Sequence, residues 1–209
     1  VGATRTPKIA FDPNTAGSFV IQYRISSTSN RGAVMAGTLT GTSLSFGTEN
    51  VYTTGYSAGD FAFDPNTANK FVMAYRSQDI SYSGAVRVGT ISGTTISLGT
   101  EVVFNNSNTQ YISVAFDTSA ANKFVIAYWD GTTGSAIVGT VSGTSVSFAT
   151  EITFNTGVAK YNKLVFNPNT SGKFAIIYRD DGNSEFGTAI VGQMAASVTT
   201  QNLTSTNFL

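Results

Sequence analysis

One stretch of sequence occurs four times in this chain, and it limits the folds that the chain can adopt. The copies read FDPNTAGSFVIQYR from residue 11, FDPNTANKFVMAYR from 63, FDTSAANKFVIAYW from 116 and FNPNTSGKFAIIYR from 166. The polar residues after the first Phe of each copy, Asp12, Asp64, Asp117 and Asn167, are separated by 52, 53 and 50 residues. A period of this length indicates one supersecondary unit used four times, with neighbouring units burying one another's apolar faces. We therefore expect a single repeat domain over residues 1–209, with repeats at about 7–58, 59–110, 111–160 and 161–209.

Each repeat has the composition of several short β-strands. In the third repeat we expect strands at Ile112–Phe116, Lys123–Trp129, Ser135–Val141 and Ser145–Phe154, because Val, Ile, Phe, Tyr and Thr dominate these runs. DPNT and SGTS separate them, and both are typical turn sequences: Pro presets φ, Asp bonds back to the backbone, and Gly supplies positive φ. No segment has helical periodicity, so the sequence predicts an all-β fold.

The second strand of each repeat indicates how the units are arranged. In KFVIAYW, alternate residues face opposite sides of the sheet, and both sets are largely apolar, so both faces are expected to be buried. About 50 residues and four antiparallel strands per unit match a blade of a β-propeller, here with four blades. The alternatives are part of a larger ring, an open β-repeat array, a linear β-solenoid, or two β-sandwiches.

The fourth repeat differs from the others near its end. The run around residues 197–203, where its outer strand is expected, has lost the apolar alternation. Either the N-terminal segment, residues 1–6, closes this blade, or something outside the chain completes the ring.

The composition excludes several classes of function. Lys+Arg and Asp+Glu balance at 12 each, so no global charge attracts the chain to nucleic acid or anionic lipid. Cys and His are both absent, which rules out disulfides, thiolate chemistry, Ser-His-Asp triads and His-based metal sites. No apolar run is long enough to cross a membrane as a helix. We expect no enzyme activity, no cofactor, no metal and no membrane insertion.

The loops of a blade divide into two sets at opposite ends of the molecule. The DPNT and SGTS turns hardly vary between repeats, whereas the loops after the second and fourth strands vary freely (ISSTSNRG, SQDISYSG, DGTTG and DDGNSEFG; TTGYSAG, NNSNTQY and NTGVAKY). Variable loops on a repeated scaffold are common binding surfaces. The alternative is that these loops vary because nothing constrains them.

The candidate ligand-binding residues lie at this variable end. The residue after the second-strand Tyr is Arg24, Arg76, Trp129 or Arg179, and planar groups there could stack on sugars or pair with ligand carboxylates. The alternative is packing between blades. The loops add further candidates: Tyr82, Tyr111, Tyr161, Asp130 and Asp180. Aromatic and polar side chains together would suit carbohydrate recognition.

The carboxylates that recur in the repeats are expected to be structural. Asp12, Asp64 and Asp117 begin turns, and Glu49, Glu101 and Glu151 each follow a Thr in the fourth strand. A catalytic pair needs one unusual constellation rather than a residue at every equivalent position. A repeated cation site is the alternative.

These repeats resemble those of large tail-fibre and other virion-associated proteins of bacteriophages, particularly marine ones, and of related bacterial surface proteins. The resemblance rests on the pattern FDPNTANKFVIAYRD…GTAIVGTVSGTSVSFGTEVVF and on the tail TTQNLTSTNFL, and it covers nearly the whole chain. It implies a virion structural or attachment module at the virion surface or otherwise extracellular. Its expected partners are other virion proteins or a host-surface glycan, and it could form a homo-oligomer. A secreted or cell-surface lectin-like adhesin and a purely architectural spacer or decoration domain remain alternatives.

Overall fold

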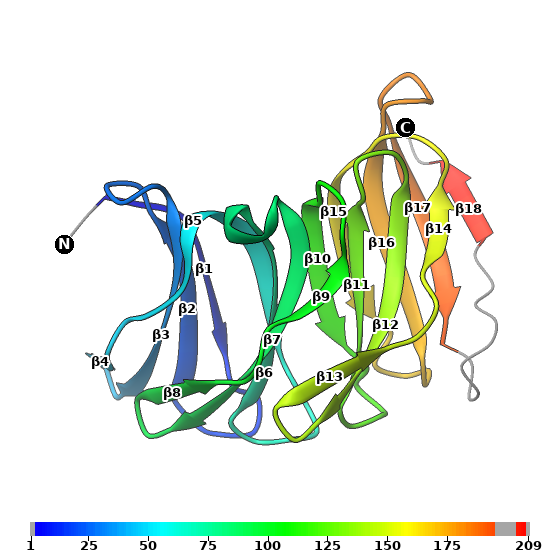
Figure 1. Cartoon of the computed structure of the whole chain (residues 1–209). Coiled ribbons are helices and arrows are strands. Elements are labelled where there is room, and N and C mark those ends of the chain that lie inside the picture. The colour runs from blue at the N-terminus through cyan, green and yellow to red at the C-terminus, as the bar shows by residue number, and fades with distance from the viewer. Residues whose placement is uncertain (1–2, 195–203, 208–209) are drawn as a thin grey trace.

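The computed structural model describes residues 3–194 and 204–207, and within these residues the chain is built of β-strands with one short 3-10 turn (Figure 1). They form four successive antiparallel units: unit 1 (residues 4–53), unit 2 (57–105), unit 3 (110–155) and unit 4 (159–193 with 204–207). The strands of units 1 and 2 are β1 (Thr4–Phe11), β2 (Ser18–Ile25), β3 (Arg31–Thr40), β4 (Ser43–Phe46), β5 (Asn50–Phe63), β6 (Lys70–Ser77), β7 (Ser83–Ser92), β8 (Thr95–Leu98) and β9 (Val102–Asn105), with the 3-10 turn η1 (Gln78–Ile80) between β6 and β7. Those of units 3 and 4 are β10 (Gln110–Phe116), β11 (Lys123–Trp129), β12 (Gly134–Ser142), β13 (Ser145–Phe148), β14 (Ile152–Asn155), β15 (Ala159–Phe166), β16 (Lys173–Asp180), β17 (Phe186–Gln193) and β18 (Thr204–Asn207). The all-β prediction is confirmed.

The fourth strand of a unit is not continuous, contrary to the prediction of one strand over Ser145–Phe154. β13 and β14 are separate, and both pair with the same strand, β12. At the break between them Glu151 accepts a hydrogen bond from the Tyr128 hydroxyl. At Glu151 the chain is therefore held by a side-chain hydrogen bond and not by backbone pairing with β12. Units 1 and 2 repeat the arrangement: Tyr23 donates to Glu49 at 2.6 Å and Tyr75 to Glu101 at 2.5 Å.

The connection between units 1 and 2 also differs from the prediction. The segment TTGYSAG was expected to be a loop, but it lies inside the long strand β5. The start of β5 pairs with β3 of unit 1, and Ser57–Phe63 pairs with β6 of unit 2. Units 1 and 2 therefore share one sheet.

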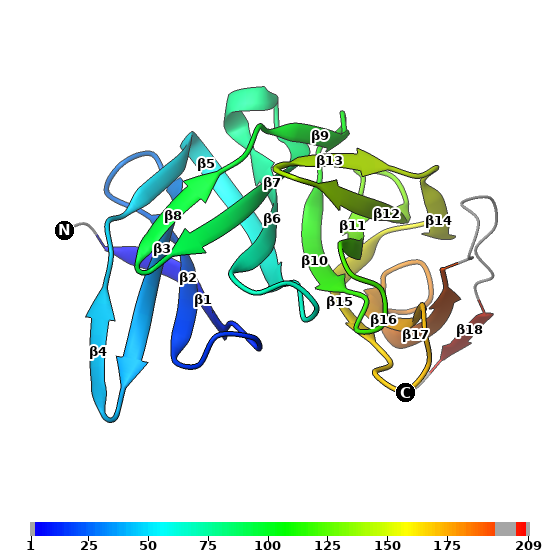
Figure 2. The same cartoon turned by 90° about the horizontal axis from the view of Figure 1, so that it is seen from below.

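The units stack face to face because their strands are apolar on both sides (Figure 2). Each unit has a leading face of large side chains, which in unit 3 includes Phe124 and Ile126, and a trailing face of smaller ones, including Val125 and Ala127. The leading face of unit 3 packs on Val72 of unit 2, and its trailing face packs on unit 4. The second strand β11 is thus buried on both sides, as predicted.

The outer hairpins pack on the preceding unit as tightly as the faces do. A Cβ on Gly99 would lie 2.2 Å from the carbonyl oxygen of Thr144, in the hairpin turn of the following unit. At the equivalent place in unit 1, a Cβ on Gly47 would lie 1.8 Å from the Thr94 carbonyl. Only glycine allows this approach of the two backbones.

The DPNT turns connect neighbouring units. One carboxylate oxygen of Asp64 accepts the Asn66 N–H at 2.9 Å, which forms the turn, and the other accepts the Asn122 N–H of the next unit at 3.0 Å. Asp12 makes the same contact with Asn69 at 2.7 Å. The turn role predicted for these aspartates is confirmed, and the contact to the next unit is additional.

The stack is open. None of the sheets closes on itself, and units 1 and 4 lie at opposite ends of the molecule (Figures 1 and 2). A propeller of four blades is therefore not confirmed. Of the two alternatives for the fourth blade, completion by the N-terminal segment is wrong for the part that is described, because Thr4 and Arg5 pair with β2 and the outermost described strand of unit 4 is β18. The outer strand expected around residues 197–203 lies outside the described residues.

Candidate ligand-binding site

The variable loops gather along one edge of the stack, at the top of Figure 1, so that every unit contributes to this edge; η1 also lies there. We call this edge the variable-loop end. At this end the first strands of the units border a cleft of about 400 Å³. All four units contribute to it: Lys8 from unit 1, Arg76 from unit 2, Tyr111 from unit 3 and Tyr161 from unit 4, and Tyr56 is added by the part of β5 that connects units 1 and 2. Such a cleft depends on the stacking of the units and cannot form in any one repeat.

Local backbone irregularities place two of the tyrosines at the cleft. The pairing of β10 with β11 shifts register between Gln110 and Ser113, and that of β15 with β16 shifts at the equivalent place. Tyr111 and Tyr161 occupy these bulges with φ of 52° and 57°. Left-handed backbone is unfavourable for a tyrosine, and bulges often redirect side chains at functional sites. The two rings meet edge to face with their centroids 5.2 Å apart.

Arginine and tyrosine side chains alternate beside the cleft, and two of them, Tyr56 and Arg76, line it. The Arg24 guanidinium lies 4.6 Å from the centroid of the Tyr56 ring, and Arg76 lies 5.5 Å from the same ring and 4.3 Å from Tyr82. Cation–π contacts of this kind hold a guanidinium in place without neutralising it. A second hollow of about 330 Å³, bordered by Asn30 and Gln78, lies against the same Tyr56 and Arg76.

Arg24 and Arg76 have no ion-pair partner among the described residues. The Nε of each is buried without a hydrogen-bond partner. The charge of these two guanidinium groups is therefore not compensated by any described acid, and an anion at their outer nitrogens would supply the missing partner.

Arg179 differs from these two arginines because its charge is compensated. It lies 5.4 Å from the centroid of the Tyr161 ring, and its Nε donates to Asp181 at 2.9 Å. Asp181 also accepts from Lys160 at 2.5 Å, and this ammonium holds the pKa of that carboxyl below its usual range. Arg179 therefore supports the Tyr161 ring rather than offering a free charge.

The remaining predicted site residues lie apart from the cleft lining. Trp129 is half-buried at the end of β11, opposite Gln110 in the ladder. Asp180 accepts the Gly182 N–H at 3.0 Å and thereby closes the β16–β17 turn. Asp130 accepts the N–H groups of Thr132 and Thr133 at 2.7 and 2.6 Å; burial opposes ionisation of its carboxyl, but these hydrogen bonds outweigh burial and lower its pKa.

Sequence reasoning missed Tyr56, which both arginines contact. It lies in TTGYSAG, a segment recognised as variable, and an aromatic residue in such a segment was the available signal. Its role depends on Arg24 and Arg76, which lie on two different units.

The cleft lining combines two basic side chains, Lys8 and Arg76, with three tyrosines. Acidic side chains are absent from the part of the cleft lining that the structure describes. Across residues 3–194 and 204–207, no group of three or more His, Cys, Asp or Glu side chains is arranged to hold a metal ion. Among the described residues, no helix is long and apolar enough to cross a membrane.

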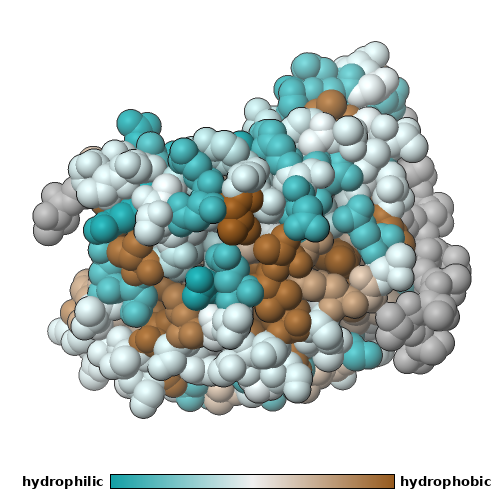
Figure 3. All heavy atoms as spheres, viewed as in Figure 1, coloured by the Kyte–Doolittle hydropathy of each residue, from teal (hydrophilic) through white to brown (hydrophobic). Residues whose placement is uncertain are grey.

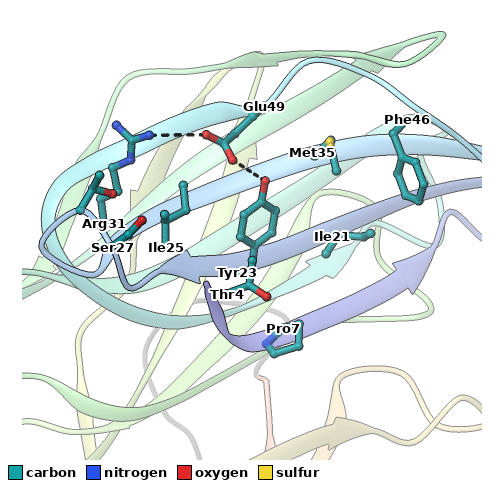
Figure 4. A pocket seen from close by; sticks show the side chains of 11 residues that line it. Thr4, Pro7, Ile21, Tyr23, Ile25, Ser27, Arg31, Met35, Phe46 and Glu49 are labelled. Atoms are coloured by element: carbon teal, nitrogen blue, oxygen red, sulfur yellow. Dashed lines mark hydrogen bonds and ion pairs between the residues drawn. The ribbon is translucent and has the colours of Figure 1, made fainter. Parts of the chain in front are cut away.

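The apolar surface lies elsewhere on the molecule. In Figure 3 apolar side chains group across the middle of the face in view, and the loop end above them is mostly polar. A hollow of about 790 Å³ lies on the exposed leading face of unit 1 and is bordered by Ile21, Tyr23, Met35 and Phe46 (Figure 4). The hollow extends to the variable loop of unit 1, because Ser27, Thr28 and Arg31 also border it.

A scan against models of known protein families and a search of curated proteins both found no match to this chain.

Proposed function

We propose that this chain is a non-enzymatic attachment module of a virion, built of propeller-like blades, whose variable-loop end binds an acidic glycan on a host surface. The uncompensated guanidinium groups of Arg24 and Arg76, held against Tyr56 beside a cleft to which all four units contribute, are the observation that carries this proposal. The virion setting comes from the resemblance of the repeats and not from the cleft.

The side chains at the cleft match the chemistry of an acidic sugar. A guanidinium can form paired hydrogen bonds with a carboxylate or a sulfate, and such charge-assisted bonds are about twice as strong as neutral ones. The apolar face of a sugar ring packs on an aromatic side chain, and Tyr161 is 63% exposed. The cleft thus offers both an anchor for charge and a surface for stacking.

Binding of the labelled chain to an array of bacterial glycans, and to intact bacteria, tests the proposal. The variant Arg76→Gln should weaken binding about 10- to 100-fold, since a hydrogen bond to a charged group contributes roughly 1.5–3 kcal/mol. Tyr161→Ala should weaken binding through loss of stacking. Lys173→Gln is the matched control: it also removes one positive charge, but from an exposed position at the opposite end of unit 4.

Three results would contradict the proposal. Binding that survives in a folded Arg76→Gln variant would place the ligand elsewhere, and an equal loss in Lys173→Gln would mean that only net charge matters. Binding to no glycan and no cell would favour a spacer or decoration domain.

A further inference from the structure

The leading face of unit 1 exposes side chains that every other unit buries. Phe11 is 52% exposed, whereas the equivalent Phe63, Phe116 and Phe166 are 4–8% exposed. Ile9 is 61% exposed, and the equivalent Val114 and Leu164 are both buried. Figure 4 shows the hollow on this face, with Ile21, Met35 and Phe46 around it. The face differs from the other three only in having no preceding unit packed on it.

The trailing face of unit 4 is exposed in the same way. Val165, Ile177 and Val191 are 63%, 44% and 45% exposed. The residues equivalent to Ile177 and Val191 in unit 2, Ala74 and Val88, are buried against unit 3. The stack therefore ends in two apolar surfaces, a leading face on unit 1 and a trailing face on unit 4.

The contacts between neighbouring units, called joints below, show what covers such surfaces: in each joint the trailing face of one unit packs on the leading face of the next. In all three joints, the residue equivalent to Val165 in one unit packs against the core cluster that contains the residue equivalent to Ile9 in the next: Ala10 with Phe61, Ala62 with Val114, and Ala115 with Leu164. The trailing face of unit 4 also has about the same apolar side-chain volume as the trailing face of unit 3, which is buried in a joint. Val125 and Ala127 of unit 3 become Ala175 and Ile177, so one side chain shrinks while its neighbour on the face grows.

We infer that unit 4 of one copy packs its trailing face on the leading face of unit 1 of a second copy. The joint between the copies repeats the joints within the chain, in which the same kinds of face already meet. Two different surfaces meet in such a contact, so the assembly closes into a ring or extends as a filament. The inference rests on the two exposed faces and not on the proposed ligand binding at the cleft.

Polar groups at the new joint are less favourable than those inside the chain. Lys8, Asp60 and Ser113 occupy equivalent positions and form a row: Lys8 bonds Asp60 at 2.7 Å, and Ser113 bonds Asp60 at 3.3 Å. The fourth position of the row is Lys163, which would face Lys8 of the second copy. Like charges at this point weaken the joint, so we expect the association to be reversible and to depend on concentration.

Sedimentation velocity over a range of concentrations, with two surface variants, tests the inference. The wild-type chain should increase in mass with concentration, whereas Ile9→Lys and Val165→Glu should each remain monomeric. Both positions are more than half exposed in the single chain, so both variants should fold. An equimolar mixture of the two should form a 1:1 dimer, because the trailing face of the first variant and the leading face of the second are both unchanged.

The variant Lys163→Asp should tighten the association about tenfold, because an acid would then face Lys8. The inference is overturned if the wild type stays monomeric up to millimolar concentration. It is also overturned if either variant alone still associates, if the mixture stays monomeric, or if Lys163→Asp leaves the association unchanged or weaker.

Discussion

Replacing Phe124 with alanine should lower the free energy of unfolding by about 3–5 kcal/mol, the usual cost of removing a buried aromatic side chain. Phe124 is 0% exposed and lies on the leading face of unit 3, against unit 2. Its ring also packs on Phe116 and Phe148, with centroids 5.5 and 6.3 Å away. The cavity would open inside the joint between units 2 and 3. Neither unit can shift to fill it without losing other contacts, so the cavity would persist. Urea or thermal unfolding followed by circular dichroism measures the change.

Phe11→Ala is the matched control for this prediction. Phe11 belongs to the same kind of face, but it is half-exposed because no unit precedes unit 1. At protein concentrations where the chain is monomeric, its loss should cost only about 1 kcal/mol, since much of its apolar area is already in water. Equal costs for the two variants would show that Phe124 is not held between two units.

Replacing Asp64 with asparagine should cost about 1.5–3 kcal/mol, although the change is nearly isosteric. The amide oxygen can still accept the Asn66 N–H and keep the turn, as the Asn167 side chain does for the Asn169 N–H in unit 4. The carboxylate oxygen that accepts the Asn122 N–H would become an NH₂ group, which places donor against donor at a partly buried contact whose Asp64 side chain is fully buried. Hydrogen bonds to charged groups contribute about 1.5–3 kcal/mol.

The reverse change, Asn167→Asp, is the control for the Asp64 variant. Asn167 is exposed and has no following unit within the chain, so adding a charge there should change the stability of the monomer by less than about 0.5 kcal/mol. Chemical denaturation of both variants at low protein concentration makes the comparison. A cost below about 0.5 kcal/mol for Asp64→Asn would show that the contact between Asp64 and Asn122 does not hold the units together.

The features that the sequence predicted correctly are those determined within one repeat. Alternation along KFVIAYW is enough to predict a strand buried on both faces, because Val125 and Ile126 point to opposite sides. The turn role of Asp64 follows from its place in DPNT. These predictions need only local geometry and the period of the repeat.

The features that were missed depend on contacts between distant residues. The fourth strand breaks at Glu151 because that carboxylate bonds Tyr128, 23 residues earlier in the chain. Burial and Glu151 both raise the pKa of Tyr128, so the hydroxyl stays a donor at neutral pH. The pairing of Tyr128 with Glu151 cannot be predicted from the two residue types alone.

The candidate site was predicted in part. Arg24 and Arg76 were identified from their equivalent places in the repeats, and the structure brings both to one tyrosine. The sequence did offer a signal that separates them from Arg179: the loop DDGNSEFG directly after Arg179 supplies Asp181, which compensates its charge, whereas the loop ISSTSNRG after Arg24 contains no acid. The pairing itself depends on how the loop of the fourth repeat folds back on Arg179.

Hydrogen exchange on the dilute, monomeric chain tests most directly the central claim of four stacked units with two open ends. Repeat stacks are stabilised by nearest-neighbour contacts, so end units open more readily than units with a neighbour on each side. The second strands of units 2 and 3, β6 and β11, should therefore exchange most slowly, and β2 and β16 should exchange faster. Equal protection of all four second strands would contradict the open stack and indicate that units 1 and 4 cover each other.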